Sequence, residues 1–194
     1  DSLVQLSHKT RFPIFKLIGY LMALAFISFF ILLIMAGVQN MFLLRLFLSW
    51  VLFNAIFAFT FAKLAGAHWT SAIVGGLVAW ATSLNPLLAP GWFAGYVELK
   101  YLSISTSDFE KLNKLFDNKD MSTSSLISSL YGVPLFKLIM IVAMTNLGSI
   151  IASLLFPFVV IPLIAPDIGG VSALFDALLQ GVENILRLSS NFLN

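Results

Sequence analysis

The sequence contains no cysteine and few charged residues. Without cysteine, its 194 residues form no disulfide, cysteine-based zinc site or thiol nucleophile. Charged residues make up only 10% of the chain, whereas soluble domains usually carry about 25%. Nineteen Phe and four Trp, against nine Asp and Glu, leave too much apolar surface for a disordered chain. The composition therefore predicts an integral, multi-pass protein of the cell membrane.

Residues that could perform catalysis are equally scarce. The two histidines, His8 and His68, lie 60 positions apart, and neither belongs to an HExxH motif or has carboxylates spaced to complete a metal site. No aspartate falls within a long apolar stretch, which excludes a paired-aspartate mechanism there. Ser149 has no histidine in its own stretch to act as a base. We expect no catalytic residue, metal site or cofactor in this chain, and the net charge of +2 is too small to indicate a nucleic-acid partner.

Charged residues divide the chain into four long charge-free stretches, at 17–44, 46–62, 64–97 and 138–166. A charge at the bilayer centre costs about 2.5–3.5 kcal/mol, and about 20 apolar helical residues suffice to cross the hydrocarbon. We expect the first, second and fourth stretches to be full spans, with the side chains of Arg45 and Lys63 reaching outward from the ends of the second. Pro157 and Pro162 predict a kink near the end of the fourth.

The third stretch cannot form one regular helix. Pro86 and Pro90 each remove a backbone donor and disfavour helix at the preceding residue, and lipid cannot satisfy the carbonyls that are left unpaired. A broken segment, either re-entrant or a hairpin, is therefore predicted. Gly91 and Gly95 form a GxxxG pattern that is typical of close helix contact.

Two amides lie within separate apolar stretches. Asn85 and Asn146 each need a hydrogen-bond partner, and two interpretations are open. They bond to one another or to the carbonyls freed by Pro86, which we favour, or they form a polar solute site at the broken helix, as in transporters. The candidate polar site is Asn85, Asn146 and Ser149, with Pro86, Pro90, Gly91 and Gly95 forming the turn and its packing, and Gly148 on the facing surface.

The hydrophilic segment 98–137 contains a short predicted surface helix. Ser107 to Glu110 form a capping box, in which Asp108 and Glu110 complement the positive end of the helix. Phe109 begins an apolar face, and Glu98 is expected on a solvated rim. His68, beside Trp69, is either a proton-relay group or an interfacial ring, and we favour the second.

The tail after Pro166 repeats apolar residues at helical spacing. Its polar face contains Asp176, Glu183 and Arg187 rather than a lysine stripe, so we expect an amphipathic helix that docks on the bundle rather than on anionic lipid. The predicted organisation is all-α and polytopic: a polar lead-in at 1–16, a membrane region at 17–97, a hydrophilic loop at 98–137, a final span at 138–166 and the tail at 167–194. The chain begins at Asp1 and its lead-in lacks a cleavage pattern, so we expect a fragment or processed chain.

Lysine and arginine indicate an orientation. If the broken stretch returns to the face it entered, nine basic residues gather on one side, against Arg45 and Arg187 opposite. If the third stretch instead crosses the membrane once, five basic residues lie on one side and six on the other, and the count favours neither orientation. We therefore favour the returning arrangement, with the N-terminus and the 98–137 loop in the cytoplasm. The nine are Lys9, Arg11, Lys16, Lys63, Lys100, Lys111, Lys114, Lys119 and Lys137.

Three short segments resemble the membrane domain of the TraB family, the pheromone-shutdown proteins. They are residues 82–86 (TSLNP) continuing at 91–98 (GWFAGYVE), residues 107–110 (SDFE) and residues 145–149 (TNLGS). The resemblance implies an N-terminal soluble domain, absent here, that is similar to Tiki-type metal-dependent peptidases and acts on secreted peptide pheromones by binding, sequestering or degrading them. The chain departs from the family at 99–105, where members commonly carry an Arg-Lys-Pro run. An outward peptidase domain also conflicts with the charge count.

The resulting hypothesis is a non-catalytic membrane anchor and assembly domain. Its expected partners are the lipid bilayer, further copies of itself and a peptide ligand bound through the absent domain. Two alternatives remain open, a small transporter or channel with a polar site at the broken helix, and an oligomerising membrane scaffold.

Overall fold

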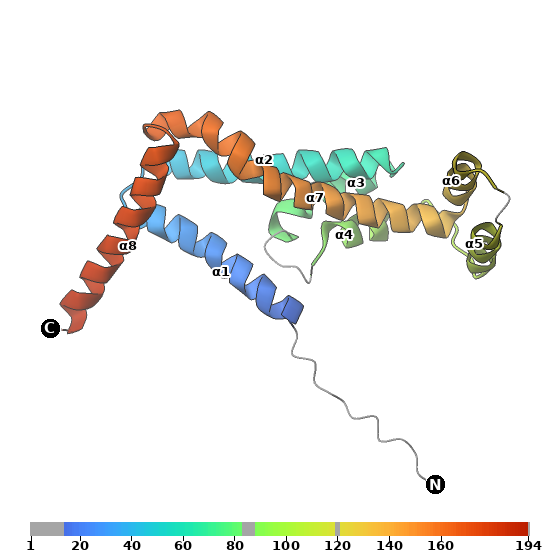
Figure 1. Ribbon diagram of the computed structural model, residues 1–194, viewed down its shortest axis with the longest axis horizontal. Helices are drawn as coiled ribbons and strands as arrows, with labels where there is room; N and C mark the ends of the chain where they lie inside the picture. Colours follow the sequence, from blue (N-terminus) through green and yellow to red (C-terminus); the bar gives the residue numbers. More distant parts are fainter. Residues whose placement is uncertain (1–13, 83–87, 119–120, 194) are drawn as a thin grey trace, which may run out of the picture.

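The computed structural model describes residues 14–82, 88–118 and 121–193, and every regular element in them is helical (Figure 1). This confirms the predicted all-α class. The elements are α1 (Ile14–Met35), α2 (Asn40–Leu64), α3 (Trp69–Thr82), α4 (Pro90–Glu98), α5 (Ser107–Asp117), α6 (Thr123–Tyr131), α7 (Pro134–Ile164), the 3-10 helix η1 (Ala165–Ile168) and α8 (Val171–Leu193).

Helices α2 and α7 run side by side through the centre of the molecule (Figure 1). Among the described residues, these two are long and apolar enough to cross a membrane, the second counted together with η1. The apolar part of α1 at Ala23–Met35 and helix α3 are shorter. Figure 1 also shows α7 bending towards its C-terminal end, where Pro157 and Pro162 lie inside the helix.

The first helix boundary differs from the predicted one. The chain turns at residues 36–39, where Gly37 has a φ of +77°, a conformation open to a residue without a Cβ. Arg45, which was expected to separate two spans, instead lies inside α2. The prediction of a boundary at Arg45 was wrong because the chain already turns at Gly37, and the charged side chain of Arg45 does not interrupt the backbone hydrogen bonds of α2.

The third stretch forms an antiparallel pair of short helices, α3 and α4. The backbone N–H of His68, just before α3, donates to Glu98 Oε2 at the end of α4 over 2.9 Å, so the pair starts and ends at the same end of the bundle. Pro90 is the first residue of α4, where its missing N–H costs no helical hydrogen bond. The turn with Asn85 and Pro86 lies outside the described residues.

The remaining helices lie at the two ends of the central pair (Figure 1). Helices α5 and α6 lie beyond the N-terminal end of α7, and α8 packs across α1 near the other end. A Cβ on Gly181 of α8 would lie 2.2 Å from the carbonyl oxygen of Leu32, and Asn184 donates to the carbonyl of Met35 over 2.8 Å. The single apolar face predicted for α8 is divided, because Leu174 is buried against the bundle while Phe175 is exposed.

Candidate functional site

A buried polar group joins α2 to α7 at the middle of the bundle. The side chain of Asn54 on α2 is 0% exposed. Its Oδ1 accepts hydrogen bonds from the hydroxyls of Ser149 (3.3 Å) and Ser153 (3.4 Å) on α7, and its Nδ2 donates to the carbonyl of Trp50 over 3.1 Å. Asn54 was not predicted, although the signal that singled out Asn85 and Asn146, an amide in an apolar stretch, applies equally to it.

Close backbone contact brings these polar groups together. A Cβ on Gly148 of α7 would lie only 2.6 Å from the carbonyl oxygen of Phe57 on α2. The α2 residues Ala58 and Ala62 are also fully buried. Small residues let the two helices approach until short side chains such as Ser149 and Asn54 can bond across the interface.

Asn146 lies on another side of α7 and faces α4. Its Oδ1 accepts a hydrogen bond from the backbone N–H of Gly91 over 2.7 Å. Gly91 is the second residue of α4, so its N–H has no partner within its own helix. The amide of one helix therefore caps another, and this bond is possible because Gly91 brings no side chain between them.

Asn146, Gly148 and Ser149 were predicted to form one surface facing the broken helix, but in the structure they contact two different helices. Gly91 and Gly95 contact α7 at Val142 and Asn146, whereas Gly148 and Ser149 contact α2. The reason is geometric, because successive residues of a helix point about 100° apart, so nearby positions of α7 face different neighbours. The expectation that Asn146, Gly148 and Ser149 form one surface was wrong. Asn85 and Pro86 lie outside the described residues.

Glu98 is buried rather than on a solvated rim. It is 1% exposed, and its carboxylate accepts the N–H of His68 at the start of α3. A negative charge at a helix N-terminus is stabilised by the helix dipole and by N–H groups that lack intrahelical partners. The prediction failed because only the returning path of α4 brings Glu98 to this position.

Exposed aromatic side chains and the half-buried Lys63 lie at this end of the bundle. The ring of His68 stacks on Tyr101, with centroids 3.8 Å apart, and its Nδ1 lies 3.0 Å from Thr70 Oγ1. Lys63 Nζ donates to the carbonyl of Ala67 and lies 4.4 Å from the centre of the Trp69 ring. Aromatic rings therefore lie beside a lysine at this end of the bundle, and the interfacial role of His68 stays a prediction.

The start of α5 is capped two residues earlier than predicted. The N–H of Ser105 donates to Asp108 Oδ2 over 3.3 Å, and the N–H of Ser107 donates to Ser105 Oγ over 3.3 Å. Ser107 is already the first helical residue, so it cannot be the cap of a box that closes at Glu110. Asp108 is 1% exposed, whereas Phe109, the first residue of the predicted apolar face, is 60% exposed.

Because Asp108 accepts several hydrogen bonds, we expect the start of α5 to lose order on acidification. Lys111, followed by the backbone N–H groups of Ser105 and Leu135, lowers the pKa of Asp108 below its ordinary value of 3.8, against the opposing effect of burial. A lowered pKa means that this stabilisation is present above about pH 4 and is lost as pH falls through the lowered pKa. We expect amide hydrogen exchange at the start of α5 to accelerate there, beyond the intrinsic pH effect.

The matched variants for this prediction are Asp108→Asn and Glu110→Gln. Asp108→Asn removes the titrating group and should abolish the acid-dependent step. Glu110 is exposed on the same helix turn, so Glu110→Gln should leave the step in place. An acid step that persists in Asp108→Asn would show that another group controls it.

A comparison with protein families identifies the chain. The family model described as "TraB family protein, C-terminal domain" matches residues 14–165. The chain belongs to the TraB family. The match covers α1 to α7 and ends at the first residue of η1, so α8 lies beyond it.

One curated relative of this TraB family chain is an uncharacterized protein of Methanocaldococcus jannaschii. The two are 30% identical over 137 residues, which cover 69% of this chain and 32% of the relative. The chain thus spans about a third of that relative's length. No solved structure matches the chain.

Two of the family-like segments meet across the α4–α7 contact. Residues 91–98 form most of α4, and residues 145–149 lie in the middle of α7. Gly91 and Asn146 come from these two segments and bond to each other. In residues 14–82, 88–118 and 121–193, no group of three or more His, Asp or Glu could hold a metal ion. The arrangement is suited to holding helices together, because Asn146 bonds to Gly91 on α4 and Ser149 bonds to Asn54 on α2.

Proposed function

We propose that this chain is the multi-pass membrane anchor and assembly domain of a TraB family protein, without a catalytic role of its own. The observation that carries the proposal is the seam through the bundle, where α7 contacts α2 through Asn54 and Ser149 and contacts α4 through Asn146 and Gly91. Apolar side chains such as Leu52 and Ile150 face outward from the same helices. Polar and small residues inside with apolar residues outside is the pattern expected of helices packed in lipid.

The charge distribution supports a re-entrant α3–α4 pair. Because α3 begins and α4 ends at the same end of the bundle, Lys63 and Lys100 lie on one side. Lys137 joins them, since its Cε would lie 3.4 Å from a Cβ on Gly66. Among the described residues, Arg45 and Arg187 belong to the other end. An excess of lysine marks the cytoplasmic side, so we propose that the lysine end faces the cytoplasm.

As a membrane anchor, this chain would position a further domain, and that domain would carry the activity of the whole protein. A relative about three times as long as the matched region leaves space for a further domain. Together with the resemblance to the pheromone-shutdown proteins, this supports an anchor for a domain that binds, sequesters or processes peptide signals. In that arrangement peptide chemistry belongs to the further domain, and this chain supplies its position and assembly in the membrane.

Single-cysteine labelling tests the proposed topology, because residues 1–194 contain no cysteine, and any cysteine of the further domain would first be replaced by serine. We expect Ser103→Cys, at the lysine end, and Ser172→Cys, at the start of α8, to be exposed on opposite sides of the membrane. The full-length protein in intact cells would be treated with a membrane-impermeant maleimide before and after permeabilisation. Ser172→Cys should react before permeabilisation, and Ser103→Cys should react only afterwards.

Three results would contradict the proposal. Extraction of the wild-type protein from membranes by alkaline carbonate would exclude a membrane-spanning anchor. Labelling of both cysteines from the same side would exclude the proposed membrane crossing by α7, and reversed labelling would exclude the proposed orientation. Ile127→Cys, exposed on α6, is the matched control and should react like Ser103→Cys.

A further inference from the structure

An ion pair joins distant parts of the chain at the arginine end of the bundle. Arg45 Nη1 on α2 donates to Asp167 Oδ2 in η1. The two side chains remain 61% and 44% exposed, so other edges of both charged groups face outward. A guanidinium has five N–H donors and a carboxylate accepts several hydrogen bonds, so the pair can bind a further charged molecule without separating.

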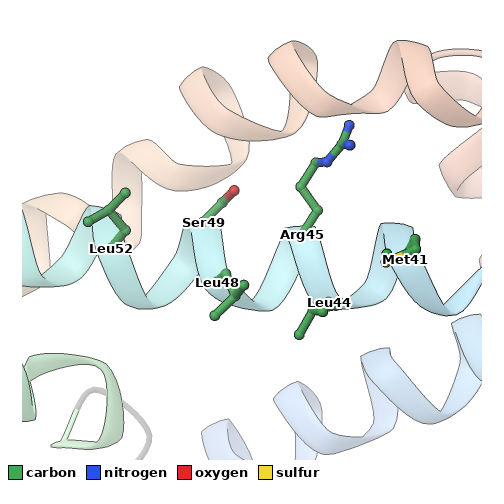
Figure 2. Close-up of a pocket in the computed structure, with 6 residues that line it drawn as sticks. All are labelled: Met41, Leu44, Arg45, Leu48, Ser49 and Leu52. Atoms are coloured by element: carbon green, nitrogen blue, oxygen red, sulfur yellow. The ribbon is translucent and has the colours of Figure 1, made fainter.

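An apolar groove leads away from Arg45 along α2. It has a volume of about 360 Å³, and Figure 2 shows Arg45 and Ser49 on the side towards α7 while Leu44 and Leu48 point to the opposite side. The residues that line it are Met41, Leu44, Arg45, Leu48, Ser49 and Leu52. Apart from Arg45 and Ser49, they offer only apolar surface.

A polar pocket adjoins the mouth of this groove. It has a volume of about 200 Å³ and is lined by Gln39 and Asp167 together with Met41, Phe42 and Arg45. Met41 and Arg45 line both the pocket and the groove, so the two lie next to each other. A polar pocket with one cation and one anion, joined to an apolar groove, has the shape and chemistry of a site for an amphiphile with a charged head and an apolar tail.

We propose that this surface binds a phospholipid whose head group carries a phosphate and a primary ammonium, as in phosphatidylethanolamine. The phosphate lies at Arg45, the ammonium lies at Asp167 and an acyl chain follows Leu48 and Leu52. The inference rests on the membrane location proposed above. It adds a specific lipid partner that location alone does not require.

Charge complementarity selects this head group over two common alternatives. Arginine binds phosphate through paired N–H donors. A primary ammonium donates hydrogen bonds to the carboxylate of Asp167, whereas the quaternary ammonium of phosphatidylcholine has no N–H to donate. The glycerol head of phosphatidylglycerol leaves a net negative charge beside Asp167, which repels it.

The depth of Arg45 in the bundle is consistent with contact to a lipid phosphate. Arg45 is six residues into a 25-residue helix, and helical side chains point back towards the N-terminus. Its guanidinium is therefore directed towards the end of α2, where the head groups of one leaflet would lie. Leu48 and Leu52 lie one and two turns deeper, at acyl-chain level.

Native mass spectrometry of the full-length protein in detergent tests the proposal with three lipids of identical acyl chains. We expect phosphatidylethanolamine to be retained several-fold better than phosphatidylcholine or phosphatidylglycerol. Arg45→Gln should reduce its retention about tenfold, the effect of one charge-assisted contact. Asp167→Asn should remove the preference for ethanolamine over choline, and Arg187→Gln, on α8 and outside the groove, should change nothing.

A charge-swapped variant tests whether lost lipid binding results from unfolding after the ion pair is broken. Combining Arg45→Asp with Asp167→Arg keeps an ion pair but places the carboxylate at the groove, and it should lose lipid as Arg45→Gln does. Equal retention of all three lipids, a preference for phosphatidylglycerol, or unchanged retention in Arg45→Gln would overturn the lipid site. Carbonate extraction distinguishes the lipid site from the membrane anchor. If the protein stays in the membrane but shows no lipid preference, only the lipid-site proposal fails.

Discussion

Replacing Gly91 by alanine is expected to destabilise the helix bundle by about 1–3 kcal/mol, the usual cost of forcing an extra group into a packed interface. The new Cβ would lie 2.2 Å from the carbonyl oxygen of Val142 and 2.7 Å from Asn146 Oδ1. Both are closer than atoms can approach, and the first is backbone, so α4 has to move away from α7. That movement also breaks the hydrogen bond from Gly91 N–H to Asn146. Thermal unfolding of the purified protein in detergent would measure the loss.

Gly95→Ala is the matched control for Gly91→Ala. It lies one turn along the same helix, and its Cβ would meet Val142 Cγ2 at 2.6 Å. Because a side chain can rotate where a backbone carbonyl cannot, Gly95→Ala should cost clearly less, and adding Val142→Ala should relieve its clash. Equal effects of Gly91→Ala and Gly95→Ala, or no effect of either, would contradict the close α4–α7 contact.

If α2 crosses the membrane as proposed, replacing Asn54 by aspartate is expected to cost about 2.5–3.5 kcal/mol, the cost of an acidic residue near the middle of a membrane helix. The change alters almost no volume. It removes the Nδ2 donor and places a carboxylate oxygen beside the carbonyl of Trp50, 3.1 Å from the present nitrogen. The hydroxyls of Ser149 and Ser153 can still donate hydrogen bonds to the new carboxylate. The loss of stability would therefore come from the buried charge and the missing Nδ2 donor. The midpoint of thermal unfolding is again the measurement.

Asn113→Asp provides the control for Asn54→Asp. Asn113 is exposed on α5, so the same chemical change there places the charge in contact with solvent and should be nearly neutral. If Asn54→Asp were as stable as Asn113→Asp, Asn54 would not lie in a dry interface between α2 and α7. That result would favour a hydrated polar centre and would return attention to the transporter hypothesis.

The seam explains how one long helix organises the others. Helix α7 presents Ser149 and Gly148 to α2 and Asn146 to α4, so it holds a long helix and a broken pair on different sides. In the lipid environment proposed above, contact between helices would depend on close packing and hydrogen bonds rather than on hydrophobic burial. The small and polar residues of α7 therefore determine which helices assemble and in which register.

The amino-acid pattern alone was sufficient to predict the helical class, the TraB family membership and the break around Pro90. These properties depend on composition, on short segments and on the local chemistry of proline, all of which are present before folding. It also identified Asn146, Gly91 and Gly95 as packing candidates, because an amide or a glycine in an apolar stretch is conspicuous on its own. It missed Asn54, to which the same criterion applies.

Only the tertiary structure decided the partners of these residues. The return of α4 along α3 brings Glu98 to the N–H of His68 and buries a carboxylate expected in solvent. The bend of the chain at Gly37 keeps Arg45 within α2, where it pairs with Asp167, 122 residues away. The physical reason is the same in both cases. Helix periodicity shows which residues share a face, but the partner of that face depends on turns and on contacts between segments far apart in the chain.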